Sequence, residues 1–158
     1  MPKADKKKTA LGRNLKAAFL VLGLILVAAA ILLIWKGSDN NQTVNLRAGT
    51  ADYKLIVTKN TAEQEKGLGG RSSLPFNQGM LFDFGSSGVR CFWMKDMQFP
   101  IDIIWLSPNK RIVYIQHDAK PSSYPGTFCP AQPARYVIEL NSGQTQLNHI
   151  KVGQALEF

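Results

Sequence analysis

The stretch from Arg90 to Asp102, RCFWMKDMQFPID, is the densest mixture of aromatic and charged residues in the chain. Alternate residues of a strand point to opposite faces, so we expect Phe92 and Met94 to face the core. Trp93 and Lys95 then face away from it. An aromatic wall beside Lys and Asp side chains can stack against a sugar or another planar ligand and form hydrogen bonds with it. The ligand-binding cleft that we predict is formed by Arg71, Trp93, Lys95, Asp96 and Asp102.

Two other interpretations of these residues stay open. In the first, Trp93 closes a small core and Lys95 forms a structural ion pair with one of the two aspartates. In the second, two of the carboxylates of Asp96, Asp102 and Glu139 act as a general acid and base, which would make the domain a hydrolase. The sequence gives no separation between these carboxylates, so it assigns no catalytic residue.

The two cysteines, Cys91 and Cys129, lie in the second half of the chain. A disulfide between them is chemically permitted in an oxidising compartment, and two separate thiols are the alternative. Cys129, His117 and Asp118 are the residue types of a nucleophile, a base and an orienting acid, but no flanking pattern supports such a site. Cys91 and Met94 are three residues apart, so on a strand they do not converge on a metal. We predict neither a metal nor a cofactor.

Strand patterns dominate the chain beyond residue 50. Runs rich in β-branched and aromatic residues predict strands at residues 53–58, 80–84, 90–94, 101–106, 111–116 and 135–140. Turn-forming residues at 107–110 predict an antiparallel hairpin between the fourth and fifth of these strands. Thr61 and Gln64 fit a capping box for one short helix, which Gly67 and the next glycines end. The proline-rich residues 121–133 predict a long irregular loop.

These elements predict a mainly β (β-rich α+β), barrel-like domain with one short helix at residues 44–158. A single N-terminal transmembrane helix is expected before it. Residues 17–35 are 19 residues without a charge or a strongly polar side chain. As a helix they cover about 28 Å, close to the roughly 30 Å of bilayer hydrocarbon. We therefore expect a helix in the lipid bilayer at 17–35, a basic cytoplasmic segment at 1–16 and a polar linker at 36–43.

The formal net charge of +8 arises mainly near the N-terminus, where residues 1–36 hold seven of the 19 Lys and Arg residues. By the positive-inside rule this charge places the N-terminus in the cytoplasm. The domain is then extracytoplasmic, on a single-pass protein of the cell (inner or plasma) membrane. A cleaved signal peptide is the alternative. Because the charge reports topology, no nucleic-acid partner is predicted.

Five sequence blocks occur in order with characteristic spacing. They are QEKGLGGR at 64–71, GMLF at 79–82, FWMKD at 92–96, PIDII at 100–104 and ARYVIEL at 134–140. With these blocks the chain resembles the DUF192 family over residues 53–157. The resemblance implies a compact β-rich fold behind a signal or an anchor, and it implies no defined reaction.

Three functional hypotheses follow. The leading one is the binding of a cell-envelope ligand in the predicted cleft. The second is the hydrolase that uses carboxylates. The third is an interaction module for a protein partner in a membrane assembly, which predicts an exposed apolar patch in place of a concave pocket.

Overall fold

The computed structural model describes residue 23, residues 42–58 and residues 60–158. The predicted segments at 1–16 and 17–35, apart from residue 23, and most of the linker lie outside the described residues. Within the described residues, no helix is both long enough and apolar enough to cross a membrane.

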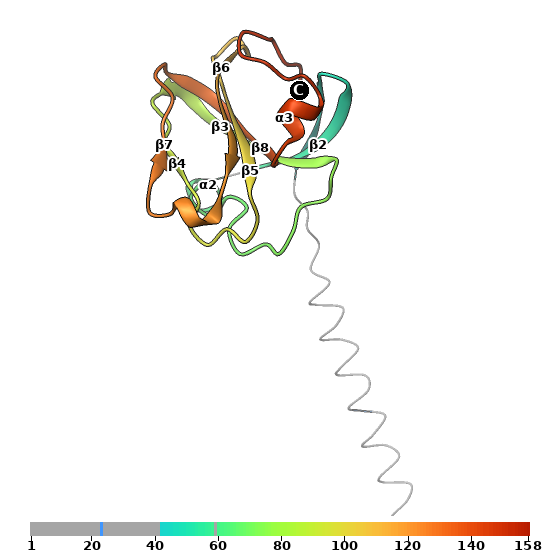
Figure 1. Ribbon diagram of the computed structural model, residues 1–158, viewed down its shortest axis with the longest axis vertical. Coiled ribbons are helices and arrows are strands. Elements are labelled where there is room, and N and C mark those ends of the chain that lie inside the picture. Colours follow the sequence, from blue (N-terminus) through green and yellow to red (C-terminus); the bar gives the residue numbers. More distant parts are fainter. Residues whose placement is uncertain (1–22, 24–41, 59) are drawn as a thin grey trace, which may run out of the picture. The chain divides into compact units, whose positions relative to one another are not determined.

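Six strands of the described domain form one mixed sheet in the order β1-β2-β3-β8-β5-β6, and two short strands, β4 and β7, pair separately (Figure 1). In chain order the elements are β1 (Thr43–Ala48), β2 (Ala51–Val57), α2 (Thr61–Lys66), β3 (Gln78–Gly88), β4 (Phe92–Trp93), β5 (Ile101–Leu106), β6 (Ile112–Ala119), the 3-10 turn η1 (Pro121–Ser123), β7 (Thr127–Phe128), β8 (Ala134–Asn141) and α3 (Gln144–Leu147).

The predicted hairpin is confirmed, because β5 and β6 pair antiparallel with Ile104 opposite Ile115. The other neighbours are also antiparallel except β2 and β3, which run parallel with Ile56 opposite Met80. A parallel pair needs a crossover connection, and here this connection contains α2. The predicted strand at 90–94 is reduced to the two residues of β4 and lies outside the main sheet.

The main sheet is not closed, so the expectation of a barrel-like fold is corrected to an open sheet. Its edge strands, β1 and β6, do not pair with each other. The C-terminal segment instead makes single bridges beside both edges, from Glu157 to Arg47 and from Ala155 to Arg111. Isolated bridges of this kind complete no ladder, and residues 42–58 and 60–158 supply no further strand that would close the sheet.

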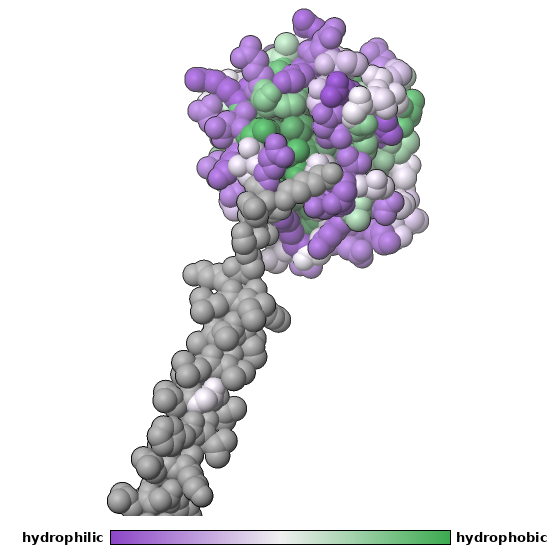
Figure 2. All heavy atoms as spheres, turned by 180° about the vertical axis from the view of Figure 1, so that it is seen from behind, coloured by the Kyte–Doolittle hydropathy of each residue, from purple (hydrophilic) through white to green (hydrophobic). Residues whose placement is uncertain are grey.

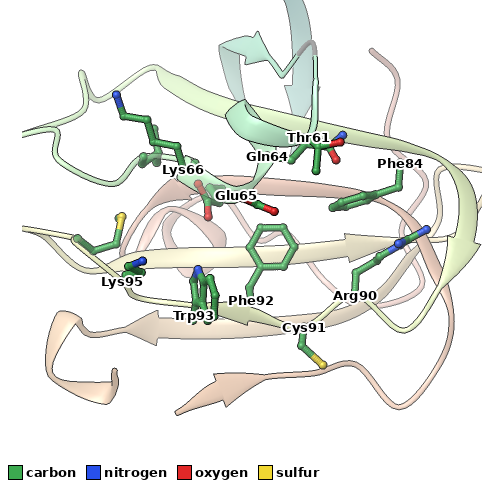
Figure 3. A pocket seen from close by; sticks show the side chains of 14 residues that line it. Thr61, Gln64, Glu65, Lys66, Phe84, Arg90, Cys91, Phe92, Trp93 and Lys95 are labelled. Atoms are coloured by element: carbon green, nitrogen blue, oxygen red, sulfur yellow. The ribbon is translucent and has the colours of Figure 1, made fainter. Parts of the chain in front are cut away.

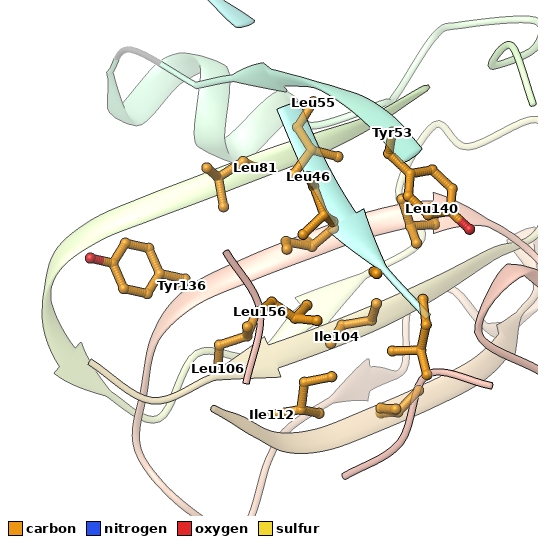
Figure 4. Close-up of a cluster of buried hydrophobic side chains, with 14 residues drawn as sticks. Leu46, Tyr53, Leu55, Leu81, Ile104, Leu106, Ile112, Tyr136, Leu140 and Leu156 are labelled. Atoms are coloured by element: carbon orange, nitrogen blue, oxygen red, sulfur yellow. The ribbon is translucent and has the colours of Figure 1, made fainter. Parts of the chain in front are cut away.

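Hydrophobic side chains pack on both faces of the sheet. The first cluster contains Leu46, Ile104, Ile138 and Leu156, with other residues of β1, β2, β5 and β8 (Figure 4). The second cluster, on the opposite face, contains Phe82, Trp105, Val137 and, from beyond α2, Leu68. All six residues of β5 are buried, because this strand is covered on both faces. The second face carries the candidate site.

The helix α2 begins one residue earlier than the sequence suggested. Asn60, not Thr61, is the N-cap, and its side-chain oxygen accepts the backbone N–H of Glu63 at 3.0 Å. Asn is as good a cap as Thr, so the first suitable side chain takes this position. The predicted end is confirmed, because Gly67 is the C-cap.

Exposed large hydrophobic side chains come from several separate parts of the domain. Figure 2 shows one face, on which hydrophilic residues cover most of the surface and hydrophobic ones gather near the middle. In the described part of the chain the exposed set is Phe76, Val89, Trp93, Tyr124, Leu147 and Val152. Within this set the one pair of rings in contact is Trp93 with Tyr124, whose centroids are 6.5 Å apart.

Candidate ligand-binding site

A pocket of about 430 Å³ opens between α2 and the segment that contains β4 (Figure 3). The residues that line it are Thr61, Gln64, Glu65, Lys66, Gly67, Leu68, Phe84, Arg90, Cys91, Phe92, Trp93, Lys95, Met97 and Glu139. Its volume lies within the roughly 300–1,000 Å³ typical of small-molecule sites. The mixture of aromatic, cationic and acidic side chains makes it amphipathic.

The wall that contains β4 is attached to the rest of the domain at three points. The indole Nε1 of Trp105 donates to the backbone carbonyl of Arg90 at 2.6 Å. Cys91 is joined to Cys129 by a disulfide, and β4 pairs with β7 directly beyond it. Met94 is buried, whereas Trp93 is 47% exposed. The predicted alternation of faces along this segment is therefore confirmed, and the attachments fix the exposed face beside the pocket.

Aromatic rings form one side of the pocket. Phe92 packs edge to face against Phe82 at 5.0 Å and against Trp105 at 5.7 Å between centroids. Phe84 meets Phe92 in the same geometry at 6.3 Å. Figure 3 shows Phe92 between Trp93 and Arg90 on this wall, with Thr61, Gln64 and Glu65 of α2 opposite. Contacts from the second core cluster hold the Phe92 ring in place, so the wall is preformed.

Two cationic side chains lie over aromatic rings at the pocket. The guanidinium carbon of Arg90 is 4.5 Å from the centroid of the Phe84 ring, and its Nη2 donates to the carbonyl of Ser86 at 3.1 Å. The ammonium of Lys95 is 5.9 Å from the centroid of Trp93. Such cation–π contacts orient the cation without neutralising it. No ion pair within the described residues involves Arg90 or Lys95.

Glu139 of β8 is the deepest polar residue of the site. It is 4% exposed, and its neighbours across the two adjacent strands are Met80 and Ile103. Burial in this apolar surrounding raises the pKa of the Glu139 carboxyl to about 8, and the backbone N–H of Leu68 opposes the shift by donating a hydrogen bond. At neutral pH the carboxyl group is therefore mostly protonated and can donate as well as accept.

Two buried side-chain atoms in the described part of the chain have no hydrogen-bond partner, and both belong to residues that line this pocket. They are Oε2 of Glu139 and Nε of Arg90. A buried polar group without a partner costs about 1–3 kcal/mol, and native proteins retain few of them. The sequence patterns indicate neither residue as part of a ligand site; they indicate Glu139 as one of three candidate catalytic carboxylates.

Of the five residues predicted to form the cleft, the pocket includes Trp93 and Lys95. Arg71, Asp96 and Asp102 are not among its lining residues. Asp96 occupies a turn with φ 58°, where its backbone carbonyl accepts the N–H of Gly70 at 2.9 Å. The alternative in which Trp93 closes a small core and Lys95 forms a structural ion pair also differs from the structure. Trp93 is half exposed, and Lys95 forms no ion pair within the described residues.

Asp102 is buried on the other face of the sheet. Its carboxylate accepts the backbone N–H of Asp118 at 3.0 Å, the backbone N–H of Thr145 at 2.9 Å and the Thr145 hydroxyl at 2.6 Å. Asp102 lies opposite Leu140 and Glu139 lies opposite Ile103, so the two carboxylates point to opposite faces. The structure therefore does not bring this pair together as the acid and base of a hydrolase.

The part of the chain that the structure describes offers neither a free thiol nor a metal site. Both cysteines are in the disulfide, so Cys129 provides no free nucleophile. The hydrogen-bond partner of His117 Nδ1 is the Thr145 hydroxyl, at 2.8 Å, and not Cys129. Among the residues that the structure describes, no three His, Cys, Asp or Glu side chains group in a way that could hold a metal ion.

The fold and the pocket define an open, mainly β domain with a preformed amphipathic cavity. The chain belongs to the DUF192 family, described as "Uncharacterized ACR", whose model matches residues 43–158. A search of curated proteins finds no match.

Solved structures that are similar to the chain include two bacterial proteins. One is described as a "putative transcription regulator" from Sinorhizobium meliloti, with a TM-score of 0.70, 29% identity, and coverage of 74% of this chain and 94% of that chain. The other is a protein of unknown function from Novosphingobium aromaticivorans, with a TM-score of 0.71, 28% identity, and coverage of 77% and 89%.

Proposed function

We propose that this DUF192 domain binds a small amphipathic ligand of the cell envelope in the pocket between α2 and β4. The observation that carries the proposal is the coincidence of the two unpartnered buried atoms, Glu139 Oε2 and Arg90 Nε, in residues of one pocket. Both atoms are shielded from solvent, so a ligand gains these hydrogen bonds as the Arg90 and Glu139 side chains turn toward the pocket.

The aromatic side supports the same proposal. Trp93 is 47% exposed although the domain has buried positions for large rings such as Trp105. A half-exposed indole beside a cavity offers apolar area to a planar group at little cost in conformational entropy. The pocket favours a ligand over the alternative of an interaction module, for which we would expect a broad convex apolar patch.

The place of binding is also a proposal. We propose that residues 17–35 anchor the chain in the cell membrane and that the domain lies on the extracytoplasmic side. The support is the length of the apolar run and the basic residues before it. The disulfide between Cys91 and Cys129 agrees with an oxidising compartment. Alkaline phosphatase fused after Phe158 should be active in intact cells, and an inactive fusion of normal abundance would contradict this placement.

The binding proposal is tested with the full-length protein in lipid nanodiscs and the neutral probe 1-naphthylacetamide, titrated by calorimetry. The double variant Trp93→Ala, Lys95→Ala removes the exposed wall of the pocket. We expect its affinity for the probe to fall roughly tenfold, equivalent to about 1.4 kcal/mol.

The matched control is Phe76→Ala, Lys151→Ala, which also removes an exposed aromatic ring and an exposed lysine but does not line the pocket. Its affinity should equal that of the unmodified protein. Unchanged binding in a folded Trp93→Ala, Lys95→Ala variant, or no binding by the unmodified protein, would contradict the proposal.

A further inference from the structure

The charges around the pocket are unequal. Lys66, Arg90 and Lys95 line it as cations, and Glu65 is the one acidic side chain besides Glu139. None of the three cations takes part in an ion pair within the described residues. On the two adjacent strands, the residues paired with Glu139 are the apolar Met80 and Ile103. The charged residues of these strands, Asp83 and Asp102, alternate with the residues that share the face of Glu139.

Of the two unpartnered atoms, Arg90 Nε requires an acceptor, and a protonated Glu139 carboxyl can use one. Arg90 is oriented by the Phe84 ring and by Ser86, so its Nε–H is a fixed donor without an acceptor. The Glu139 carboxyl is largely protonated at neutral pH because of its burial, so it too has a hydrogen to donate. A ligand with acceptor atoms can pair with both groups, whereas an ammonium group can donate to Glu139 only and leaves the Arg90 Nε–H without an acceptor.

The position of Lys95 adds a direction. Its ammonium lies 5.9 Å from the centre of the Trp93 ring. A planar group that packs against this indole beside the lysine would therefore have an acidic substituent near the ammonium. An aromatic surface beside a cation is a common arrangement for a ligand that combines an apolar body with a negative charge.

We infer that the pocket selects a small anion, namely a carboxylate, sulfonate or phosphate attached to a planar apolar body. The inference rests on the proposed function, because it names the chemical class of the ligand for that same pocket. The apolar body packs against Phe92 and Trp93, and the anionic group approaches Lys95. Arg90, on the other side of Phe92, is left to pair with a second acceptor atom of the ligand (Figure 3).

Three probes with one naphthalene body and different charges test this inference on the full-length protein in nanodiscs at pH 7. They are 1-naphthylacetate, which is anionic, 1-naphthylacetamide, which is neutral, and 1-naphthylmethylammonium, which is cationic. We expect the anion to bind about threefold to tenfold more tightly than the amide, and the cation to bind least, as one or two partly exposed ion pairs would produce.

Lys95→Gln should remove most of the preference for the anion and leave the affinity for the amide nearly unchanged. Lys151→Gln, at an exposed lysine outside the pocket, should change neither the preference nor the affinity.

A pH series separates Glu139 from the cations. Above pH 8 ionised Glu139 should weaken the binding of the anion several-fold, and Glu139→Gln should abolish this loss. Equal affinities for all probes, or tightest binding of the cation, would overturn the inference while the pocket remained a binding site. Binding of none of the probes would overturn both the inference and the proposed function.

Discussion

The backbone N–H of Leu68 donates a hydrogen bond to the carboxyl group of Glu139, so the chain leaving α2 and the strand β8 meet at the base of the pocket. Leu68 itself is fully buried in the second hydrophobic cluster, which holds this contact in place. One carboxyl oxygen, Oε2, still has no partner. This contact covers β8 and leaves Glu139 as a buried carboxyl group. Its protonation can therefore change with pH and with a bound ligand.

Glu139→Gln should change how stability depends on pH. The pKa of Glu139 is about 8 in the folded protein and near its ordinary value of 4.5 when unfolded. Between these values the unfolded chain binds fewer protons, so the free energy of unfolding falls as the pH rises and levels off above pH 8. The variant lacks this loss. Its stability relative to the unmodified protein should rise between pH 5 and pH 9 by on the order of a few kcal/mol, measured by urea unfolding.

The exposed residue Glu157 supplies the control for this series. Glu157→Gln should leave the pH dependence of the unmodified protein in place. If the curves for Glu139→Gln and the unmodified protein run parallel from pH 5 to pH 9, the carboxyl group of Glu139 does not have a raised pKa.

Asp102→Ala should destabilise the domain without affecting the pocket. The substitution leaves two backbone N–H groups, those of Asp118 and Thr145, without their acceptor. The expected loss is roughly 3 kcal/mol in the free energy of unfolding. Asp52→Ala, at an exposed carboxylate 4.0 Å from Arg47, should cost at most about 1 kcal/mol.

Titration of the same two variants with 1-naphthylacetate distinguishes a structural aspartate from a ligand contact. The affinity of folded Asp102→Ala should match that of the unmodified protein. A selective loss of affinity at unchanged stability would instead indicate that Asp102 contacts the ligand.

Local patterns predicted most of the sheet because they depend on neighbouring residues. The run of β-branched and aromatic residues around Ile104 and the turn after it are sufficient to place β5 and β6. The position of β8 was equally clear, but the environment of Glu139 was not. An acidic residue between Ile138 and Leu140 indicates a solvent-exposed face. Here α2 and Leu68 cover that face, and this contact is fixed by tertiary packing.

Asp102 shows the same limit on the other face. Its position beside aromatic and cationic residues in the sequence suggested a shared cleft with Lys95. Strand alternation directs it instead to the face where Thr145 of α3 binds it. α3 has only four residues, which is too short for a periodic pattern that would predict it. Formation of the disulfide could not be predicted for a similar reason, because spacing in sequence does not show whether Cys91 and Cys129 are close in space.

The disulfide should stabilise the domain and the pocket wall together. Cys91 and Cys129 are separated by 38 residues, and breaking a loop closure of this size costs about 2–4 kcal/mol in the free energy of unfolding. The double variant Cys91→Ser, Cys129→Ser should show this loss in urea unfolding. It should also bind 1-naphthylacetamide more weakly, because β4 and Trp93 are then held by fewer attachments. Reductant should reproduce both effects in the unmodified protein and have no effect on the variant. Equal stability with and without reductant, where mass spectrometry shows complete reduction, would contradict the prediction.

Gly67 allows the backbone to turn over Glu139, and replacing it should damage the site as well as the fold. Its φ of 52° and ψ of −133° form a combination that residues with a Cβ rarely adopt. A Cβ at this position would also lie 3.5 Å from the Phe82 ring and 3.6 Å from Glu139 Oε2. Gly67→Ala should lower the free energy of unfolding by roughly 1–3 kcal/mol. It should also weaken the binding of 1-naphthylacetamide, because the turn that lines the pocket must shift.

Gly85→Ala is the matched control, since Gly85 also has a positive φ, 71°, but has open space around it and does not line the pocket. This control should lose some stability and keep its affinity for the probe. If both variants bind the probe as the unmodified protein does, the turn at Gly67 has no part in shaping the pocket.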